Sequence, residues 1–400
     1  MIFPSQLSDE LESAPWDVAV IGAGPGGSVT AREAARTGLR TILIEARAFP
    51  RAKVCGSCLN SRALQVLDSV GLGSLMEEIG AVPIAGMELR IDGRSAFLPL
   101  PEGRSVTRQR LDAALLESAT VAGVRVLTEV SATVEPACES GFRRITLQGH
   151  DRAASIQSRI VVCADGLLRS SLRKLSGMGP CPSPGSRIGI GCILHRDQLT
   201  EEQAAQFPLK QITMVVGTSG YVGLSWAEAN QLSIAAAVDP AAVRTAGSPV
   251  ELVLKILATN QIQLPVIEGS WHGTSALTTD PRLNATERLF VIGDAAGYVE
   301  PFTGEGMAAA IEQSVAVMPL VAAGVRDWRA ELAEQWQSYH HSVFRQRQRV
   351  CRMSSAILKR RWLSKTAFHL LRTFPRMARI FVDSVNRPSR TVPHLDIEHV

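Results

Sequence analysis

Three glycines near the start of the chain lie at the spacing that a pyrophosphate-binding turn requires. Residues 16–27 read W-D-V-A-V-I-G-A-G-P-G-G, which places these glycines at Gly22, Gly24 and Gly27. In a strand–turn–helix unit the first permits the tight turn, the second lets the backbone approach the phosphates, and the third lets the helix pack on the strand. The free N–H groups at the start of the helix then face the phosphate oxygens. The turn is also expected to be lined by Ala23, Pro25 and Gly26.

An acidic residue follows at the distance that a ribose requires. The segment after Gly27 has the composition of a helix, Gly38 suits its C-terminus, and the apolar run T-I-L-I then ends at Glu45. A carboxylate at the end of this second strand accepts hydrogen bonds from ribose hydroxyls. The sequence therefore predicts a bound dinucleotide, FAD or NAD(P), rather than a plain tight turn. Further contacts with it are expected from Ala46, Arg47 and Val130.

Two later apolar runs also end in acids or glycines. One is S-R-I-V-V-C at 158–163, followed by Ala164, Asp165 and Gly166, and the other is R-L-F-V-I at 288–292, followed by Gly293 and Asp294. Parallel sheets bind their ligands at the carboxyl ends of their strands, so these residues are expected to meet the glycine turn. For Asp165 a second interpretation stays open, in which the carboxylate only caps a turn.

The elements that position these residues follow two patterns. Nearly continuous apolar runs with helices between them are typical of a parallel sheet, and they occur at 1–80, 104–180 and 277–330. Short, partly alternating runs separated by turns are typical of antiparallel strands, and they occur at 81–103 and 181–276. Asp92-Gly93 is a strong hairpin signal and predicts a hairpin within 81–103. We therefore expect an α/β fold with a Rossmann-like FAD- or NAD(P)-binding domain, an inserted antiparallel β-sheet substrate domain, and a helical basic C-terminal region at 331–400.

The composition is that of an ordinary globular protein. The chain has 400 residues, of which 46% are hydrophobic and 20% charged. Seven cysteines, scattered and odd in number, do not form a disulfide framework, which favours a cytoplasmic setting. No signal-peptide pattern is seen, and the apolar run 307–325 is interrupted by Glu312, Gln313 and Pro319, which indicates a core helix. No group of cysteines and histidines has convincing metal-site spacing.

Basic residues are concentrated near the C-terminus. The net charge is +4, but residues 345–387 contain twelve Lys or Arg and one acid, a local charge of +11 (12 − 1), which leaves −7 (4 − 11) for the remainder. Apolar residues such as Trp362 and Leu363 alternate with the basic ones, which suits peripheral contact with a membrane. The alternative is a helix packed on the acidic body with solvated arginines. Nothing besides the charge indicates nucleic-acid binding.

Taken in order along the chain, the motifs resemble a known group of flavoproteins. The glycine turn, Arg108-x-x-Leu111-Asp112, Ala164-Asp165-Gly166 and Gly293-Asp294 are similar to those of FAD-dependent oxidoreductases of the p-hydroxybenzoate-hydroxylase-like superfamily. Within it, K-V-C-G-S-C-L-N at 53–60 and G-D-A-A-G-Y-V-E-P-F-T-G-E-G-M at 293–307 resemble the geranylgeranyl reductase branch. The resemblance implies FAD rather than NAD as the bound dinucleotide.

The resemblance also implies roles around the flavin. Arg108 matches an arginine near the flavin or the pyrophosphate, although a solvated helix arginine is the alternative, and Asp294 matches the acid that binds the ribityl chain. The helix that starts near Gly304-Glu305-Gly306 would direct its N-terminal dipole at flavin N1 and O2. The two glycines would let a flat ring approach the backbone. Pro301 and Met307 are expected beside the ring.

Candidates for catalysis are fewer. Cys55-Gly56 matches a cysteine–glycine pair close to the flavin, which makes Cys55 a candidate catalytic residue. Cys55 and Cys58 also have the C-x-x-C spacing of a redox dithiol, and ordinary packing of two thiols is the third interpretation. No motif identifies an acid or base. Glu305 and Glu300, beside the expected flavin loop, are the best candidates.

Three reactions share this scaffold: reduction of a double bond, hydroxylation by a monooxygenase, and halogenation. The W-x-W-x-I-P segment of halogenases is absent from the sequence, and the Y-x-W-x-F-P motif of the reductase branch is matched in 221–226 only at Tyr221. The leading hypothesis is an FAD-dependent reductase or dehydrogenase of a hydrophobic small molecule, supplied with electrons by NAD(P)H or a partner flavin reductase. A monooxygenase is the alternative, and a non-catalytic flavin- or lipid-binding protein at a membrane surface is the alternative from another class.

Overall fold

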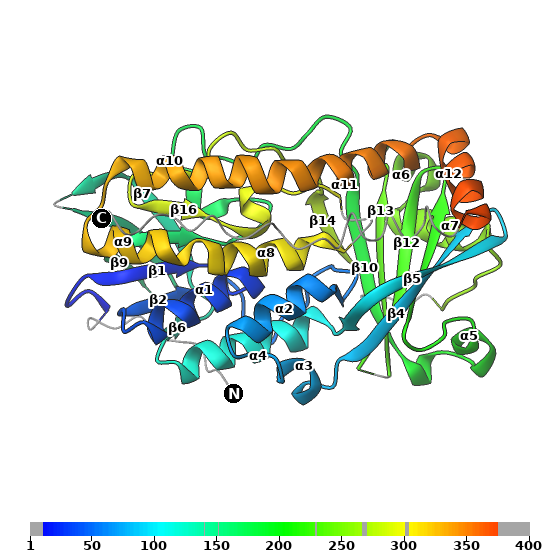
Figure 1. Cartoon of the computed structure of the whole chain (residues 1–400), viewed down its shortest axis with the longest axis horizontal. Coiled ribbons are helices and arrows are strands. Elements are labelled where there is room, and N and C mark those ends of the chain that lie inside the picture. Colours follow the sequence, from blue (N-terminus) through cyan, green and yellow to red (C-terminus); the bar gives the residue numbers. More distant parts are fainter. Residues whose placement is uncertain are drawn as a thin grey trace.

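Two β-sheets lie side by side, and long helices run along both. The computed structural model describes residues 11–139, 141–150, 152–228, 230–265, 270–300 and 304–374. Figure 1 shows the first sheet, around β1 (Trp16–Ile21), on the left and the second sheet, around β12 (Gly220–Ala227), on the right. Helices α10 (Ala330–Tyr339) and α11 (Arg345–Leu358) extend along the molecule above both sheets (Figure 1).

The first sheet has a parallel core with an antiparallel extension. Besides β1 its strands are β2 (Thr41–Ile44), β6 (Arg125–Leu127), β7 (Ser131–Glu139), β8 (Phe142–Gln148), β9 (Ala153–Cys163), β15 (Ala285–Thr286) and β16 (Leu289–Val291). Strands β16, β9, β1, β2 and β6 lie in this order and pair in parallel, whereas β8 pairs antiparallel with both β7 and β9. The carboxyl ends of β1, β9 and β16 therefore meet at one edge, as the sequence predicted.

Strands β7 and β8 cover one face of this parallel core, and helices bury the other. The helices of this part of the protein include α1 (Pro25–Arg36), α2 (Ser61–Ser69), α3 (Leu75–Glu78), α4 (Arg108–Val121), α8 (Glu305–Ala316) and α9 (Met318–Arg326). Helix α1 contacts α4 on one side and α8 on the other. Val18 and Val20 of β1 point to one core cluster and Ala19 and Ile21 to another, and all four are buried. Burial on both faces explains why the strand reads as a continuous apolar run.

The glycine turn brings three backbone segments into contact. Gly22 has a φ of +102°, and a Cβ there would lie 2.5 Å from the carbonyl oxygen of Ala164 at the end of β9. A Cβ on Gly27, in the first turn of α1, would lie 1.9 Å from the carbonyl oxygen of Gly22. No side chain fits between these segments, so glycine is required at both positions.

The second sheet is mostly antiparallel. Its order is β14-β10-β13-β12-β11-β4-β5-β3, with β3 (Cys58–Leu59), β4 (Val82–Ile91), β5 (Arg94–Ser105), β10 (Ile188–His195), β11 (Gln211–Gly217), β13 (Gln231–Val238) and β14 (His272–Ala276). The expected hairpin at Asp92-Gly93 joins β4 and β5, and both turn residues have positive φ. Two features differ from the sequence-based expectation. Strand β4 pairs with β11 in parallel, and the short β3, from outside 81–103 and 181–276, joins the edge.

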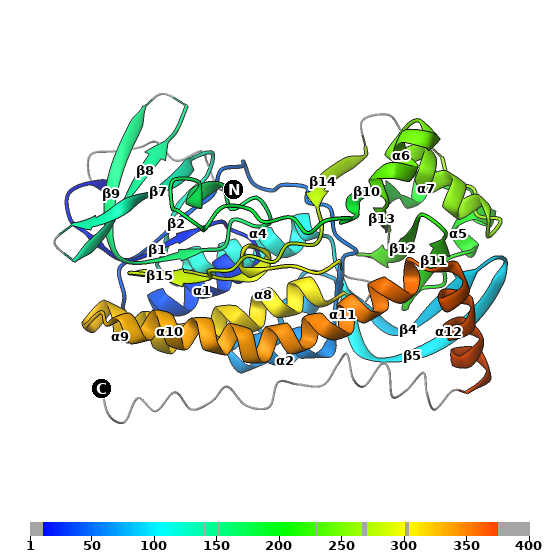
Figure 2. The ribbon, with the colours of Figure 1, turned by 90° about the horizontal axis from the view of Figure 1, so that it is seen from above.

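Short helices back the outer face of this sheet. They are α5 (Glu201–Ala205), α6 (Pro240–Ala246) and α7 (Pro249–Ala258), and their side chains form one core cluster with Val222, Leu224 and Trp226 of β12. Because side chains alternate along a strand, Tyr221, Gly223 and Ser225 face the other way. That inner face is the one turned toward the first sheet and α11 in Figure 2.

The most apolar helical segment belongs to the core. Glu305–Arg326, which spans α8 and α9, is long and apolar enough to cross a membrane, but 72% of its most apolar window is buried inside the protein. It packs against α1 and α2. This placement agrees with the sequence-based interpretation of a buried core helix.

Replacing Gly27 by alanine tests the close contact at the turn. We expect Gly27→Ala to cost about 1–3 kcal/mol, because the added methyl group overlaps the Gly22 carbonyl and forces the start of α1 away from β1. The matched control is Gly179→Ala, since a Cβ there meets nothing within 4 Å. Thermal unfolding of both variants measures the difference. Equal melting temperatures for the two variants would contradict the steric account.

Candidate functional site

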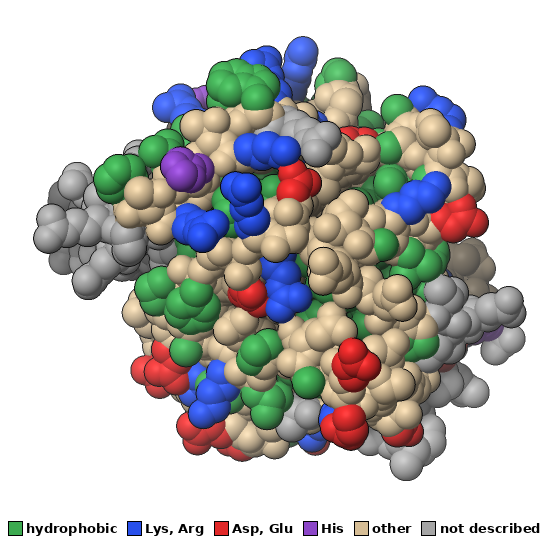
Figure 3. Space-filling model, turned by 90° about the vertical axis from the view of Figure 1, so that its right-hand side faces the viewer, with side chains coloured by type: hydrophobic (Ala, Val, Ile, Leu, Met, Phe, Trp, Pro, Cys, Tyr) green, Lys and Arg blue, Asp and Glu red, His purple; other side chains and the backbone are tan. Residues whose placement is uncertain are grey.

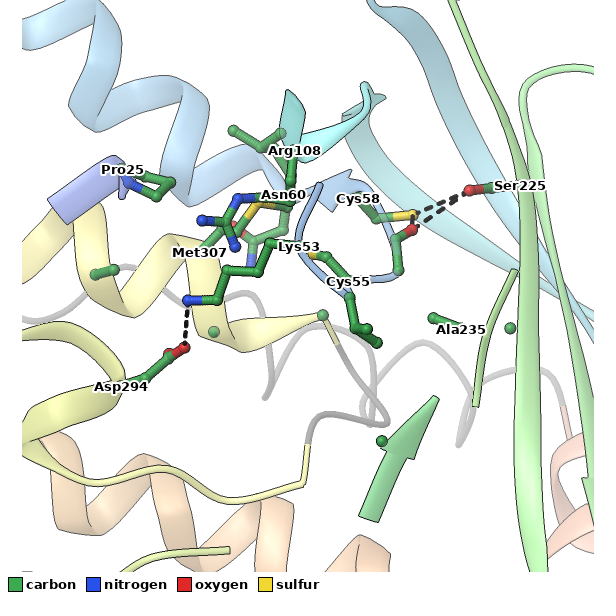
Figure 4. Close-up of a pocket in the computed structure, with 18 of the residues that line it drawn as sticks. Pro25, Lys53, Cys55, Cys58, Asn60, Arg108, Ser225, Ala235, Asp294 and Met307 are labelled. Atoms are coloured by element: carbon green, nitrogen blue, oxygen red, sulfur yellow. Dashed lines mark hydrogen bonds and ion pairs between the residues drawn. The ribbon is translucent and has the colours of Figure 1, made fainter. Parts of the chain in front are cut away.

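A continuous cavity of about 230 Å³ runs from the glycine turn to the inner face of the second sheet. Side chains from the first sheet, from the loop 53–58 and from the second sheet all line it (Figure 4). It brings together many residues that the sequence singled out: Gly24, Pro25, Gly26, Cys55, Gly56, Arg108, Ala164, Gly166, Gly293, Asp294, Gly304, Gly306 and Met307. Pro301 lies outside the described residues.

Two guanidinium groups face the glycine turn. A Cβ on Gly24 would lie 3.6 Å from Nη2 of Arg108 and 3.9 Å from Nη2 of Arg51. Arg108 is the first residue of α4, and it forms two 2.8 Å hydrogen bonds with the carboxylate of the fully buried Asp112 one turn later. Burial opposes the charge of Arg108, but Asp112 and its hydrogen bonds raise the pKa of the guanidinium above its usual value. A permanent positive charge next to a bare backbone turn suits a pyrophosphate.

Glu45 fixes the edge of this turn. Its carboxylate accepts hydrogen bonds from the N–H of Ala23 and the N–H of Arg47, both at 3.0 Å, and lies 3.5 Å from Nη2 of Arg51. The N–H of Val130 donates to the backbone carbonyl of Glu45. Ala46 and Arg47 are exposed beside it. These residues form a group at the ribose end, next to the cavity lining rather than in it.

Lys53 and Asp294 mark the middle of the cavity. The ammonium of Lys53 reaches across the cavity to lie 3.6 Å from the Asp294 carboxylate (Figure 4). Burial and the nearby Arg108 guanidinium lower the pKa of Lys53. Asp294 follows β16, as the sequence predicted, and its carboxylate is still 22% exposed. It is therefore accessible to a ligand hydroxyl.

Helix α8 begins at the far end. Gly304 precedes it with a φ of +70°, and Met307 in its first turn lines the cavity. A Cβ on Gly306 would lie 2.8 Å from the ring of Tyr298. The ring that packs on this glycine is therefore the side chain of Tyr298, whereas the sequence predicted a flavin ring near the two glycines. The free N–H groups of this helix start point a partial positive charge at the cavity.

Two of the acids that the sequence singled out lie outside the cavity lining. The carboxylate of Glu305 lies 2.5 Å from Nη2 of the buried Arg62 and does not line the cavity, which argues against a role in acid or base catalysis. Asp165 accepts the N–H of Ser171 at 2.8 Å and also lies outside the lining, so it acts as a turn cap. Burial raises the pKa of Asp165. In each case a local backbone or ion-pair partner holds the side chain away from the cavity.

Serine hydroxyls fasten the loop 53–58 to the second sheet. Ser233 lies 2.8 Å from Ser57 and 3.4 Å from the carbonyl oxygen of Cys55, and Ser225 lies 3.4 Å from that of Gly56. Both serines come from neighbouring strands, β12 and β13, at directly opposite register positions. The loop that carries Cys55 is therefore positioned by the second sheet.

The two cysteines of this loop are not equivalent. Both are free thiols, and the Cys58 sulfur lies 2.9 Å from the carbonyl oxygen of Gly56. Burial raises the pKa of Cys58 to about 12. A thiol that stays protonated is a poor partner for dithiol chemistry. Of the three interpretations of the pair, the working dithiol is the one that this geometry disfavours.

The second sheet contributes an apolar floor with small residues at its centre. Gly223 of β12 pairs with Ala235 of β13, and both line the cavity together with apolar side chains from neighbouring strands: Ile84, Met87, Leu100, Ile212, Met214 and Leu277. Counted from Tyr221, Gly223 occupies the position of the tryptophan in the Y-x-W-x-F-P motif. Trp226 points to the outer face instead, where its indole N–H donates to Phe207. The cavity has room here for an apolar ligand.

A buried ion-pair chain stands behind Tyr221. This tyrosine lines the cavity, and the Glu300 carboxylate lies close enough to its hydroxyl to influence its pKa. Glu300 pairs at 2.9 Å with Arg187, which pairs at 2.9 Å with Asp239, and Asp239 is one-third exposed. Burial and the Glu300 carboxylate raise the pKa of Tyr221. The chain leads from the cavity to the protein surface.

The sequence missed three of these residues. Arg51 lies shortly after the second strand and belongs to none of the motifs. A basic residue near Glu45, the acid expected to bind the dinucleotide, is nevertheless a signal that could have been used. Arg187 carries no local signal, because its partner Glu300 is distant along the chain. Tyr298 lies inside a quoted block, but its ring position depends on the fold.

The family comparison decides the identity of the cofactor. Residues 15–354 match the model of the family described as FAD binding domain. The chain belongs to this FAD-binding family. The residues present fit FAD: the bare turn at Gly24 faces two guanidinium groups, and the start of α8 lies at the opposite end of the same cavity. The protein is therefore an FAD-dependent oxidoreductase.

Curated relatives include reductases of two kinds. The chain is 24% identical over 297 residues to digeranylgeranylglycerophospholipid reductase of Methanosphaerula palustris, covering 73% of this chain and 72% of that protein. It is 28% identical over 343 residues to menaquinone reductase of Mycobacterium tuberculosis, covering 80% of this chain and 79% of that protein. The predicted resemblance to geranylgeranyl reductases is confirmed.

Solved structures share the fold. A flavoprotein/dehydrogenase from Cytophaga hutchinsonii superposes with a TM-score of 0.78 at 18% identity, covering 92% of each chain. The p-nitrophenol 4-monooxygenase of Pseudomonas putida superposes with a TM-score of 0.72 at 15% identity, covering 93% of this chain and 98% of that one. A flavoprotein/dehydrogenase and a monooxygenase thus share this architecture.

Removing the charge of Arg51 tests the cofactor cradle. We expect Arg51→Met to weaken FAD binding by about tenfold, which corresponds to about 1.4 kcal/mol, because one of the two cations facing Gly24 is lost. Titration of FAD into the apoprotein, followed by flavin fluorescence, measures the affinity. Arg110→Met, an exposed arginine on the same helix as Arg108, is the control and should bind FAD normally. Equal affinities for both variants would contradict the assignment.

The raised pKa of Cys58 predicts its reactivity. At pH 8 we expect N-ethylmaleimide to label the exposed Cys181 and to leave Cys58 unmodified. The sign follows from the thiolate being the nucleophile. Peptide mapping by mass spectrometry reports each site. Rapid labelling of Cys58 at pH 8 would instead support a working dithiol.

Proposed function

We propose that the protein is an FAD-dependent reductase of a long hydrophobic compound. The observation that carries this proposal is the shared cavity, in which the FAD end and the apolar floor of the second sheet adjoin each other. Met87, Met214 and Leu277 offer no charged partner to a substrate, and Gly223 with Ala235 leaves space between them. A pocket of this kind suits an isoprenoid chain or a prenylated quinone, the kinds of molecule named for the two relatives.

The chemistry requires a hydride and a proton. FAD, when bound, supplies the two-electron chemistry, with electrons from NAD(P)H or a partner flavin reductase. Reduction of a carbon–carbon double bond breaks the π bond and forms two C–H bonds, one from the hydride and one from a proton. We assign the proton to the hydroxyl of Tyr221, because this residue lines the cavity and the Glu300 carboxylate lies near its phenol. Glu300 and Arg187 position the phenol, and Asp239 connects the pair to solvent.

Hydroxylation is the second candidate. The fold is shared with p-nitrophenol 4-monooxygenase, so the scaffold is compatible with both reactions. The floor of the cavity weighs against it, because the floor is mainly apolar and none of its described residues is charged, whereas an ionised phenolic substrate needs a charged or strongly hydrogen-bonding partner. An anaerobic experiment separates the two reactions. Photoreduced holoenzyme is mixed with menaquinone or with digeranylgeranylglycerophospholipid in detergent, and flavin absorbance is followed.

Reoxidation of the flavin without oxygen, with formation of reduced product, supports the reductase. If the flavin is reoxidised only after oxygen is admitted, and the product is hydroxylated, the reductase proposal is refuted and the monooxygenase is supported.

We propose in addition that the enzyme is cytoplasmic and contacts a membrane peripherally. A long hydrophobic substrate is dissolved in lipid, so an enzyme that acts on it has to reach the bilayer surface. The basic terminal helices support this proposal through their composition, with nine Lys or Arg and no acid in residues 345–374.

Tyr221→Phe tests the proton donor. We expect the variant to bind FAD and to be reduced by NADPH or photochemically as the parent is, whereas transfer to substrate slows by about a hundredfold, the contribution of a positioned acid. Anaerobic stopped-flow measurement of the two half-reactions separates these effects. Tyr339→Phe, whose ring stacks on Trp336 far from the cavity, is the control. Unchanged transfer to substrate in Tyr221→Phe would exclude this hydroxyl as the acid.

A further inference from the structure

The two terminal helices, α11 and α12 (Arg361–Thr373), pack on the inner face of the second sheet next to residues that line the substrate cavity. Leu358, at the end of α11, and Phe368, in α12, are buried against the inner face of the second sheet. They belong to the same apolar cluster as Met87, Met214 and Tyr221, which line the cavity. Figure 2 shows α11 and α12 running along the second sheet, and the cavity is lined by the same face of this sheet.

Polar contacts that attach these helices to the body lie at the surface. Lys365 pairs with Asp92 of the β4–β5 turn at 2.7 Å, and Arg352 pairs with Asp280 at 3.1 Å. The side chains of both pairs are between 37% and 48% exposed, so water and salt screen them. Among the described residues, the ion pairs that join these helices to the body are exposed ones, and the inward apolar side chains Leu358 and Phe368 pack on the sheet.

The outward side of these helices carries apolar side chains as well. Trp362 is 66% exposed, Phe374 52% and Met353 55%, which are high values for large apolar residues. At about 100° per residue, Trp362 lies on the side of α12 opposite to the inward Leu371. Helix α12 thus has apolar residues on two sides, and the sheet accounts for one of them.

Basic side chains accompany this outward surface. Within the described residues, Arg360 and Arg372 are exposed and have no carboxylate within ion-pair distance. Figure 3 shows blue and green side chains interspersed on the end of the molecule where α12 lies. An exposed tryptophan with flanking cations is the composition of an interfacial helix. An acidic protein partner would satisfy the cations but would not account for the exposed Trp362 and Phe374 beside them.

We propose that α11 and α12 form a lid that docks on an anionic membrane surface and, in docking, uncovers the outer end of the substrate cavity. Trp362, Arg360 and Arg372 contact the lipid, and Leu358 with Phe368 leaves the sheet face. The lipid-dissolved substrate then enters directly from the bilayer. This inference rests on the proposed function, because it takes the cavity to receive a hydrophobic substrate.

Vesicle flotation of the FAD-loaded full chain tests the docking step. We expect binding to phosphatidylcholine vesicles that contain phosphatidylglycerol, little binding to phosphatidylcholine alone, and release by high salt. Arg360→Glu with Arg372→Glu should weaken binding by about tenfold or more, and Trp362→Ser should weaken it too. Matched controls on α4 are Arg110→Glu and Val121→Ser, both exposed positions on another part of the protein. Equal flotation of all variants, or no flotation of the parent, would refute membrane docking.

Cys351 reports the opening step. This thiol on α11 is 8% exposed and lies near Tyr221. Its labelling by N-ethylmaleimide, mapped by mass spectrometry, should accelerate by about tenfold on anionic vesicles and stay slow on neutral ones. Phe368→Ala should speed the labelling without vesicles, which shows that the cover is the barrier. Binding to anionic vesicles with unchanged labelling of Cys351 would refute the lid and leave a fixed docking face.

The outcomes separate this inference from the proposed function. If the enzyme reduces its substrate in detergent but neither floats with anionic vesicles nor exposes Cys351, the lid is refuted and the reductase proposal stands. If the protein floats with vesicles and exposes Cys351, but neither menaquinone nor digeranylgeranylglycerophospholipid reoxidises its reduced flavin, the reductase proposal is refuted. The role of the lid in substrate entry is then refuted with it.

Discussion

The close approach of three backbone segments at Gly22, Gly27 and Ala164 is the constraint on which the site depends. Strand β1 ends, α1 starts and β9 ends within contact distance, because a Cβ on Gly22 or Gly27 would overlap a carbonyl oxygen. With no side chain between them, the carboxyl ends of neighbouring parallel strands and the start of a helix face the same space. Gly24, which has no side chain, then faces the guanidinium groups of Arg51 and Arg108. Asp294 follows β16, the strand that pairs with β9, and lies at the same edge of the sheet.

The second sheet is joined to this edge by polar contacts rather than by apolar packing alone. Ser225 and Ser233 hold the backbone of the loop 53–58, and Arg187, just before β10, pairs with Glu300 in the segment before α8. Buried polar groups of this kind are costly when unpaired, so they favour one placement of the loop over its alternatives. The cavity owes its form to this coupling: one wall binds a cofactor, the other is apolar, and a tyrosine with a carboxylate behind it lies between them.

Local patterns predicted the elements well, and non-local contacts explain the differences. The parallel core and the hairpin at Asp92-Gly93 follow from apolar runs and turn residues a few positions apart. The direction of a side chain does not follow from such local patterns. Glu305 points to Arg62 and Asp165 points to Ser171, because partners outside the motif compete for each carboxylate. The parallel pairing of β4 with β11 and the chain from Tyr221 to Asp239 join segments that no spacing rule relates. The covering position of α11 and α12 likewise depends on the sheet face they meet.

The central claim is that both ends of one FAD lie in the cavity that also opens onto the apolar sheet face. A crystal structure of the FAD complex tests it most directly. The account predicts the ADP half at Gly24 between Arg51 and Arg108, and the flavin ring inside the cavity near Cys55 and the start of α8, with one edge toward Tyr221. A flavin ring bound outside this cavity, or separated from the apolar floor by protein, would contradict the account.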